Sequence, residues 1–298
     1  MRRQLGSDAG LVSRMFLTMF LLAALYLFFL VVLWQSGMSY SGIIIFVGAM
    51  LFFQYYYSDR MVLWSMRARE VSAREAPELH AMVERLASLA DLPKPRIAIV
   101  PSSIPNAFAT GRNPASAVVA VTTGIMELLD RQELEAVLAH EMSHIRNRDV
   151  AVMTLASFFA TIASFIMRHF LYWGGAFGGQ DRDNRGGAMV VYMVSLLVWL
   201  ISFFLIRALS RYREFAADRG AAILTGAPGQ LASALMKISG SMTRIPEKDL
   251  REAGAFNAFF IIPALKGGSL MELLSTHPSL ERRLAYLRKL EQEMELIR

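Results

Sequence analysis

Four long apolar stretches constrain the fold of this chain more than any other feature. They cover residues 15–34, 42–57, 150–172 and 188–206. A helix needs about 20 apolar residues to cross a bilayer, and only the second stretch falls clearly short of that length. Hydrophobic residues make up 54% of the 298 residues and charged residues only 19%, which is unusual for a soluble protein. The sequence therefore predicts a mainly α, four-span integral membrane protein.

The positive residues that flank these spans gather on one side. The connector 35–41 carries no charge, and only Arg168, Arg182 and Arg185 lie on the opposite side. Flanks rich in Lys and Arg stay in the cytoplasm, so we expect both termini and the long polar segments to be cytoplasmic in a multi-pass protein of the cell (inner or plasma) membrane. The residues that carry this prediction are Arg2, Arg3, Arg14, Arg60, Arg67, Arg69, Arg146, Arg148, Arg207, Arg211 and Arg213.

The order of apolar and polar segments predicts four regions. Two membrane hairpins would alternate with two polar blocks that pack into one cytoplasmic α+β domain with a small β-sheet, because neither block is long enough to complete a substantial core alone. The predicted regions are 1–57, 58–149, 150–209 and 210–298. Within the first polar block, Pro77 opens a helix that continues to about Ala90. Short β-rich runs follow at 96–100, 105–110 and 117–122, and a helical hairpin covers about 123–148.

Composition narrows the chemistry further. The chain has no cysteine, so disulfides are excluded and any zinc site must use histidine and carboxylate ligands. The net charge of +6 fits anionic lipid headgroups better than nucleic acid, because the positive residues lie at the ends of apolar runs and no nucleic-acid-binding motif accompanies them. We therefore expect a lipid bilayer as a partner and no nucleic acid.

The segment His140-Glu141-Met142-Ser143-His144 carries the strongest chemical signal. Asp130 and Glu133 provide a capping box for a helix here, and residues four apart on a helix share a face. Both imidazoles can then reach one zinc ion, with Glu141 beside them as a general base for water. Two histidines and a glutamate at this spacing also occur by chance on solvated helices, so the segment alone is moderate evidence.

A catalytic zinc site usually takes three protein ligands. The third predicted span starts just after His144, and the fourth returns the chain at about Arg207. The hairpin therefore brings Glu214 and Asp218, again four residues apart, close to the histidines. One carboxylate can bind zinc while the other hydrogen-bonds a ligating histidine. The alternative is an ordinary helix in which both carboxylates pair with Arg211 and Arg213.

Taken together, the motifs resemble the HtpX family of heat-shock-associated membrane zinc metalloproteases, which are relatives of the CAAX prenyl protease type I group. The similarity runs from about the first span to about residue 288, and the motifs occur in family order. They are NAFATG (106–111), AVVAVTTG (117–124), HEMSHIRNRD (140–149), REFAADRGAAILTG (213–226) and THPSLERRL (276–284). The linker around 181–185 and the short second span are not recognisable features of that family.

The resemblance implies a zincin-like (gluzincin) protease domain that binds one Zn²⁺ per chain. Its implied ligands are His140, His144 and Glu214, with Glu141 as the catalytic base and Asp218 supporting the site. His277 matches an HP motif and would stabilise an oxyanion or gate the site, and Arg283 occupies the arginine position that follows it. Residues Asn106, Ala107, Phe108 and Ala109 resemble the edge strand that receives the substrate backbone, although Asn106 could equally be a turn residue.

The function expected from these residues is zinc-dependent hydrolysis of peptide bonds in misfolded or damaged membrane proteins at the cytoplasmic face, as part of a stress response. The implied partners are membrane-protein or unfolded polypeptide substrates. One alternative is a dedicated processing protease with a single substrate, and another is a catalytically silent, metal-binding membrane regulator. A transporter is disfavoured because the spans carry almost no ionisable residues at their centres.

Overall fold

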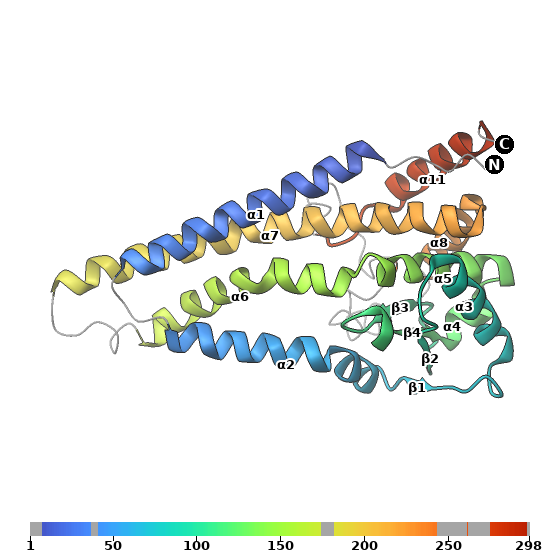
Figure 1. Cartoon of the computed structure of the whole chain (residues 1–298), viewed down its shortest axis with the longest axis horizontal. Helices are drawn as coiled ribbons and strands as arrows, with labels where there is room; N and C mark the ends of the chain where they lie inside the picture. Colours follow the sequence, from blue (N-terminus) through green and yellow to red (C-terminus); the bar gives the residue numbers. More distant parts are fainter. Residues whose placement is uncertain (1–7, 37–40, 174–181, 243–260, 262–274, 297–298) are drawn as a thin grey trace.

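The computed structural model describes residues 8–36, 41–173, 182–242, 261 and 275–296. The expected flanking residues Arg2 and Arg3 lie outside these ranges, as does part of the linker between the third and fourth predicted spans. Within the described residues the molecule is elongated, with long helices at one end and a small sheet covered by shorter helices at the other (Figure 1).

The long helices form a bundle. They are α1 (Ala9–Gln35), α2 (Ser41–Ser65), α6 (Asp149–Trp173) and α7 (Arg182–Thr225). In the described part of the chain, three segments are long and apolar enough to cross a membrane, namely Ala9–Gln35, Asp149–Arg168 and Met189–Thr225. The apolar part of α2, Ile44–Tyr57, is shorter. Three candidate spans therefore agree with the prediction, whereas α2 does not reach span length by this criterion.

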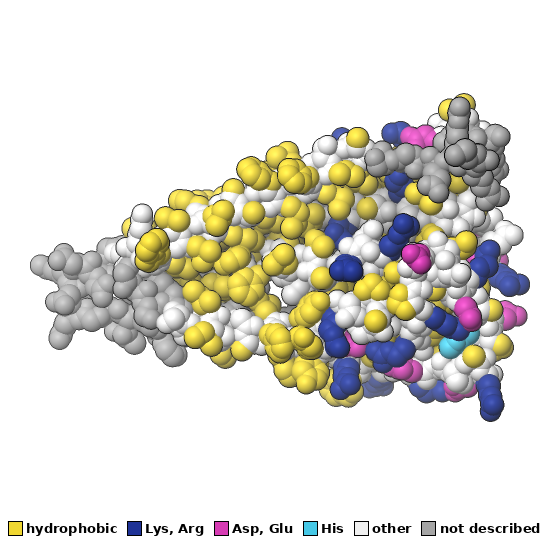
Figure 2. All heavy atoms as spheres, in the orientation of Figure 1, with side chains coloured by type: hydrophobic (Ala, Val, Ile, Leu, Met, Phe, Trp, Pro, Cys, Tyr) yellow, Lys and Arg dark blue, Asp and Glu magenta, His cyan; other side chains and the backbone are white. Residues whose placement is uncertain are grey.

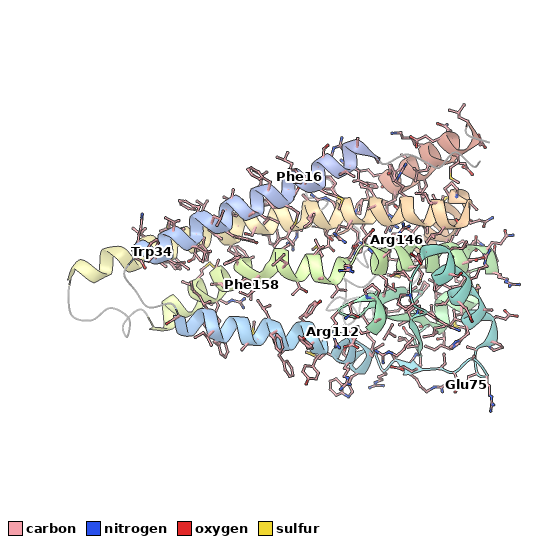
Figure 3. All side chains as sticks on the ribbon, in the orientation of Figure 1. Phe16, Trp34, Glu75, Arg112, Arg146 and Phe158 are labelled. Carbon is pink, nitrogen blue, oxygen red and sulfur yellow. The ribbon has the colours of Figure 1, made fainter. Side chains whose placement is uncertain are left out.

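The bundle has a packed interior and an apolar exterior. Phe29 of α1, Ala163 of α6 and Val198 of α7 are among the residues buried between the helices. On the outside, Phe16 is 73% exposed and Trp34 85% exposed, and both point away from the bundle (Figure 3). Figure 2 shows hydrophobic side chains covering this end, whereas charged side chains gather at the other. An apolar surface of this extent fits lipid rather than water.

The sheet has the strand order β1-β2-β4-β3. Its strands are β1 (Arg69–Glu70), β2 (Arg96–Val100), β3 (Ala107–Thr110) and β4 (Val118–Thr122). Strands β2 and β4 pair in parallel, and β1 and β3 are antiparallel edge strands. The last three strands confirm the predicted β-rich runs, whereas the two-residue β1 was not expected. Among the described residues, no further strand pairs with the outer edge of β3.

Both faces of the sheet are covered, which explains why every residue of β4 is buried. Alternate side chains point to opposite faces. Val119 and Val121 pack into the larger core with α3 and α5, while Val118 and Ala120 pack against Val62 and Leu63 at the end of α2. The end of α2 is therefore part of the globular core.

The remaining helices follow local sequence signals. They are α3 (Pro77–Ala90), α4 (Thr123–Leu128), α5 (Arg131–Arg146), α8 (Pro228–Met242) and α11 (Leu280–Glu295), with a short 3₁₀ turn at Pro114–Ser116. Helix α3 has the bounds predicted from Pro77 and ends where Asp91 adopts a left-handed conformation. Helix α5 begins with the predicted capping box of Asp130 and Glu133. The helical hairpin expected over 123–148 is confirmed as α4 and α5.

Helix α7 joins the two ends of the molecule. It is a continuous helix of 44 residues, which corresponds to about 66 Å and so to roughly twice the thickness of a bilayer core. The region boundary predicted at 209/210 falls inside this helix. Its apolar stretch ends at Ile206, and the same helix then carries Glu214 and Asp218 into the globular end of the molecule.

Candidate metal centre

Helix α5 places two histidine rings side by side. His140 and His144 are four residues apart and therefore lie on one face of the helix. Their Nε2 atoms are 3.1 Å apart. His140 is buried and His144 is half-buried. Two ring nitrogens thus converge at one point beneath the surface.

Helix α7 brings a carboxylate to the same point. Glu214 Oε2 lies 3.7 Å from His140 Nε2, and Glu214 Oε1 lies 3.6 Å from His144 Nε2. The ligand atoms of the three residues all lie within 4.8 Å of one another. Bonds of about 2.0–2.2 Å to a tetrahedral zinc would place ligand atoms roughly 3.3–3.6 Å apart. Glu214 Oε2 is buried and makes no hydrogen bond with the described residues. The two imidazoles and the carboxylate are donors that bind divalent metal ions, and their spacing fits such an ion. The Glu214 oxygen without a hydrogen bond fits it as well.

Close approach of the two helices depends on a glycine. A Cβ atom added to Gly220 of α7 would lie 2.3 Å from Ser143 Oγ and 2.7 Å from Ser143 Cβ on α5. Such distances are well inside van der Waals contact. Only glycine therefore lets α7 pack against α5 closely enough to bring Glu214 to the histidines.

The second nitrogen of His140 faces Asp218. His140 Nδ1 lies 3.0 Å from Asp218 Oδ1, and Arg283 of α11 donates from Nε to Asp218 Oδ2 at 3.0 Å. Arg283 also donates to the carbonyl oxygen of Ile261 at 2.7 Å and lies 3.4 Å from Glu214 Oε2. Asp218 is 0% exposed and Arg283 2% exposed. Arg283 is therefore committed to buried partners, and it contacts the ligand cluster both at Glu214 and through Asp218.

His277 comes to the centre from the segment that precedes α11. Its Nδ1 atom lies 3.2 Å from Glu214 Oε2, and the residue is buried. The structure therefore brings together the sequence-predicted residues Glu214 and His277, which are 63 positions apart in the chain.

The carboxylate of Glu141 lies beside the histidines and is buried. The backbone N–H of Ala109, on the edge strand β3, donates to Glu141 Oε2 at 2.8 Å. Burial raises the pKa of Glu141, although the nearby imidazoles of His144 and His140 act in the opposite direction. A raised pKa brings a carboxylate closer to the range of a general base that works near neutral pH.

Two of the candidate ligands are coupled to their buried neighbours. Burial lowers the pKa of His140, but the neighbouring carboxylates of Asp218 and Glu214 raise it by more. The pKa of His140 is therefore raised overall. Burial raises the pKa of Glu214, but the neighbouring imidazoles of His277 and His140 outweigh it and hold the pKa well below its usual range. Glu214 is thus held ionised, which is the form in which a carboxylate binds a metal ion.

Of the four predicted edge-strand residues, only Ala109 reaches the centre. Ala107 and Phe108 are buried in the two hydrophobic cores. Asn106 lies just before β3 and is 1% exposed, and its Oδ1 accepts from the backbone N–H of Ile261 at 3.1 Å. The side chain of Asn106 is therefore buried and hydrogen-bonded within the protein.

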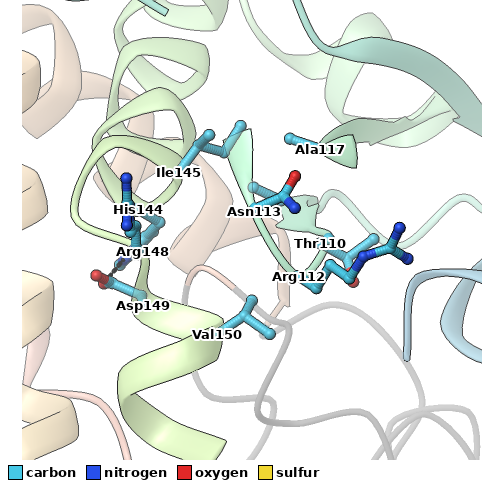
Figure 4. A pocket seen from close by; sticks show the side chains of 11 residues that line it. Thr110, Arg112, Asn113, Ala117, His144, Ile145, Arg148, Asp149 and Val150 are labelled. Atoms are coloured by element: carbon cyan, nitrogen blue, oxygen red, sulfur yellow. Dashed lines mark hydrogen bonds and ion pairs between the residues drawn. The ribbon is translucent and has the colours of Figure 1, made fainter. Parts of the chain in front are cut away.

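A small open pocket lies beside His144, between the end of β3 and the junction of α5 and α6 (Figure 4). Thr110, Arg112 and Val150 are among the residues that line it. Arg112, one of the lining residues, lies where α2 meets the globular end (Figure 3), with its guanidinium over the ring of Tyr56. The pocket is a small hollow in the surface next to His144.

Asp149 is a close neighbour of the site that was not predicted from the sequence. His144 Nδ1 hydrogen-bonds to Asp149 Oδ2 at 2.6 Å. In an unbroken helix, residues five apart are rotated by about 140° and do not face each other. The chain departs from the helix between α5 and α6, where Arg148 has a φ of 55°. Asn147 and Arg148 at the helix end, and the inclusion of Asp149 in the motif HEMSHIRNRD (140–149), were sequence signals for this return.

The chain is similar to several known proteins. The family model described as "Peptidase family M48" matches residues 73–291. A protease HtpX homolog of Moorella thermoacetica is 78% identical over 296 residues, which cover 99% of both chains. A protease HtpX homolog 2 of Methanosarcina acetivorans is 60% identical over 294 residues, covering 99% of this chain and all of that one.

A solved structure shares the fold. The crystal structure of Ste24p from S. mikatae has a TM-score of 0.56 to this chain at 19% sequence identity. The match covers 89% of this chain but only 62% of Ste24p. Membership of a metalloprotease family implies a divalent metal ion at the His–His–Glu cluster. The chain therefore belongs to peptidase family M48 and, within it, to the HtpX proteases, which are membrane metalloproteases.

Proposed function

We propose that this protein is a zinc-dependent endopeptidase that cleaves misfolded or damaged membrane proteins at the cytoplasmic face of the cell membrane. The observation that carries the proposal is the convergence of His140, His144 and Glu214 within 4.8 Å, with Glu141 beside them. These three residues would hold one zinc ion per chain.

The divalent metal supplies a Lewis acid that polarises the scissile carbonyl and lowers the pKa of water. Glu141 takes a proton from the attacking water and later gives one to the leaving amine. Ala109 holds Oε2 of this carboxylate at 2.8 Å, so Oε1 is the atom that takes the proton. Its raised pKa makes Glu141 a stronger base than an exposed glutamate.

His277 and Arg283 have different roles in this proposal. His277 lies within 3.2 Å of Glu214 and can donate a hydrogen bond to the oxyanion that forms when water attacks. Arg283 points its donors at Asp218 and Ile261 rather than at a substrate. It is therefore a positioning residue that fixes His140 through Asp218.

The substrate backbone would add to the open edge of β3. The N–H of Ala109 points away from β4, because it donates to Glu141 on the opposite side. An extended peptide along this edge would compete with Glu141 for the N–H of Ala109, and it would place its scissile bond next to the base. Main-chain hydrogen bonds do not read side chains, so this mode of binding supports weak sequence selectivity.

The proposed substrates follow from where the centre lies. Asp149, the first residue of the apolar helix α6, comes only five positions after His144. The centre is therefore close to the membrane surface, where it would meet tails and loops of other membrane proteins. The cytoplasmic orientation, the fourth span formed by α2 and a role in the stress response belong to this proposal and rest on the arginine flanks and the family likeness.

The proposal is tested with full-length protein purified in detergent. The purified protein is given an unfolded membrane protein or the native form of the same protein as substrate. Each substrate is tested before the metal is removed with a chelator, after its removal, and after zinc is restored. We expect cleavage of the unfolded form only, lost on chelation and restored by zinc. Selective cleavage of one native peptide instead would favour a dedicated processing protease. Bound metal without cleavage of any substrate would favour a silent regulator.

A further inference from the structure

A second aspartate holds the other ligand histidine. Asp149 is the first residue of α6, and its Oδ2 atom accepts from His144 Nδ1 at 2.6 Å. The Nε2 atom of the same ring faces His140 and Glu214. The hydrogen bond to Asp149 therefore places the ring proton on Nδ1 and leaves the lone pair of Nε2 for a metal ion.

Asp149 is itself held by a buried arginine. Its Oδ1 atom forms an ion pair with Nη2 of Arg213, which is 5% exposed. Arg213 also donates to the carbonyl oxygen of Asn147 at 3.1 Å, in the short link between α5 and α6. Arg213 directly precedes Glu214 in α7. The pair therefore joins one ligand, His144, to the helix that supplies another.

The two histidines are held in the same way. His140 Nδ1 faces Asp218, which pairs with Arg283, and His144 Nδ1 faces Asp149, which pairs with Arg213. The first arrangement uses α11 at the globular end of the molecule. The second uses the first residue of a membrane helix and the part of α7 that follows its apolar stretch.

Local backbone geometry builds this second arrangement. Helix α5 ends at Arg146, and the left-handed conformation of Arg148 redirects the chain into α6. The redirection returns Asp149 to the face of His144, which an unbroken helix would not do.

We propose that Asp149 and Arg213 are positioning residues that orient His144 and tie metal binding to the packing of the membrane helices α6 and α7. This inference rests on the proposed function, because it requires that His144 binds the metal. It follows that a shift of α6 relative to α7 changes the affinity of the centre for metal without any change in the three ligands.

The test measures metal affinity in full-length protein in detergent, by chelator competition for Zn²⁺ and by the visible spectrum of Co²⁺ bound in its place. Asp149→Ala should weaken affinity by about 10–100-fold and alter the Co²⁺ spectrum. Arg213→Gln should also weaken the affinity for metal. The double variant should be no weaker than Asp149→Ala, because Arg213 acts through Asp149. Asp149→Asn, which keeps an acceptor oxygen, should be intermediate.

Glu133→Gln provides the matched control. Glu133 is a buried carboxylate on α5 that ties this helix to α8 through Ser233 and Lys237, two helical turns (about 10 Å) before His140. The Glu133→Gln substitution should leave metal affinity unchanged. Wild-type affinity and spectrum in Asp149→Ala, or an equal loss in Glu133→Gln, would overturn the inference. A folded wild-type chain that binds no metal would instead overturn the proposed function.

Discussion

At the scale of single residues, the centre contains buried charged side chains that pair with one another. Arg283 lies at 2% exposure between Asp218 and Glu214, and Asp218 is fully buried. Removing one member of a buried ion pair is costly, because the other charge remains in a medium that solvates it poorly. The residues that orient the ligands should therefore also affect stability.

Replacement of Arg283 tests this dependence. Arg283→Met leaves Asp218 and Glu214 without their guanidinium, and we expect it to lower the free energy of unfolding by about 3–5 kcal/mol. The measurement is denaturant unfolding of the metal-free protein in detergent. Arg288→Ala, an exposed arginine on the same helix, is the control. A loss below about 1 kcal/mol in Arg283→Met would contradict the role assigned to this arginine.

His277 should affect chemistry rather than binding. If its imidazole stabilises the oxyanion, His277→Ala should lower kcat by about 100-fold while KM and bound zinc stay close to wild type. Steady-state kinetics with an unfolded substrate and a zinc assay measure both. An increase in KM with kcat unchanged would show that His277 acts as a gate for substrate.

Part of this site could be predicted from the sequence because its geometry is local. The spacing of His140 and His144 fixes their common face on any helix, and Glu214 with Asp218 repeats the same spacing. Asp149 could not be predicted, because its position depends on the backbone conformation of Arg148. The buried state of Asn106 could not be predicted either, because it depends on Ile261, which lies 155 positions later in the chain.

At the scale of elements, the packing of α7 on α5 decides whether the third ligand arrives. The three strands β2, β3 and β4 could be predicted from short alternating runs bounded by proline and glycine. The continuity of α7 was harder to see, because the arginines from Arg207 onward resemble the end of a span. Charge does not end a helix, however, and no glycine or proline occurs between Gly187 and Gly220.

A substitution at Gly220 tests this packing. Gly220→Ala should separate α7 from α5, lower the free energy of unfolding by about 1–3 kcal/mol and weaken zinc binding, because its methyl group overlaps Ser143. Ser143→Gly in the same chain removes the overlapping atoms and should restore zinc affinity in part. Chelator competition measures the affinity. Equal zinc affinity in Gly220→Ala and wild type would show that α7 has room to move.

At the scale of the whole molecule, one end is apolar on its outside and the other is charged (Figure 2). The termini of the described chain lie together at the charged end, where Tyr286 donates to Asp8 at 3.0 Å. The mainly helical character and the long apolar helices could be predicted from hydropathy alone. The extent to which α2 enters the bilayer could not, because its last residues pack against the sheet.

Single cysteines test the orientation, since the chain has none of its own. We expect Arg74→Cys, at the charged end, to react with a membrane-impermeant maleimide only after cells are opened. Gln35→Cys, at the far end of α1, should react in intact cells. Both positions are exposed. The opposite labelling pattern would place the catalytic centre on the outer face of the membrane.

The most direct test of the central claim is a comparison of wild type with Glu141→Gln, in which bound zinc and cleavage of an unfolded protein are measured on the same samples. The substitution keeps the size of the side chain and removes only its ability to take a proton. We predict equal zinc in both proteins and cleavage by wild type alone. Cleavage by Glu141→Gln at the wild-type rate, or a folded wild-type protein that binds no zinc, would contradict the assignment of this centre.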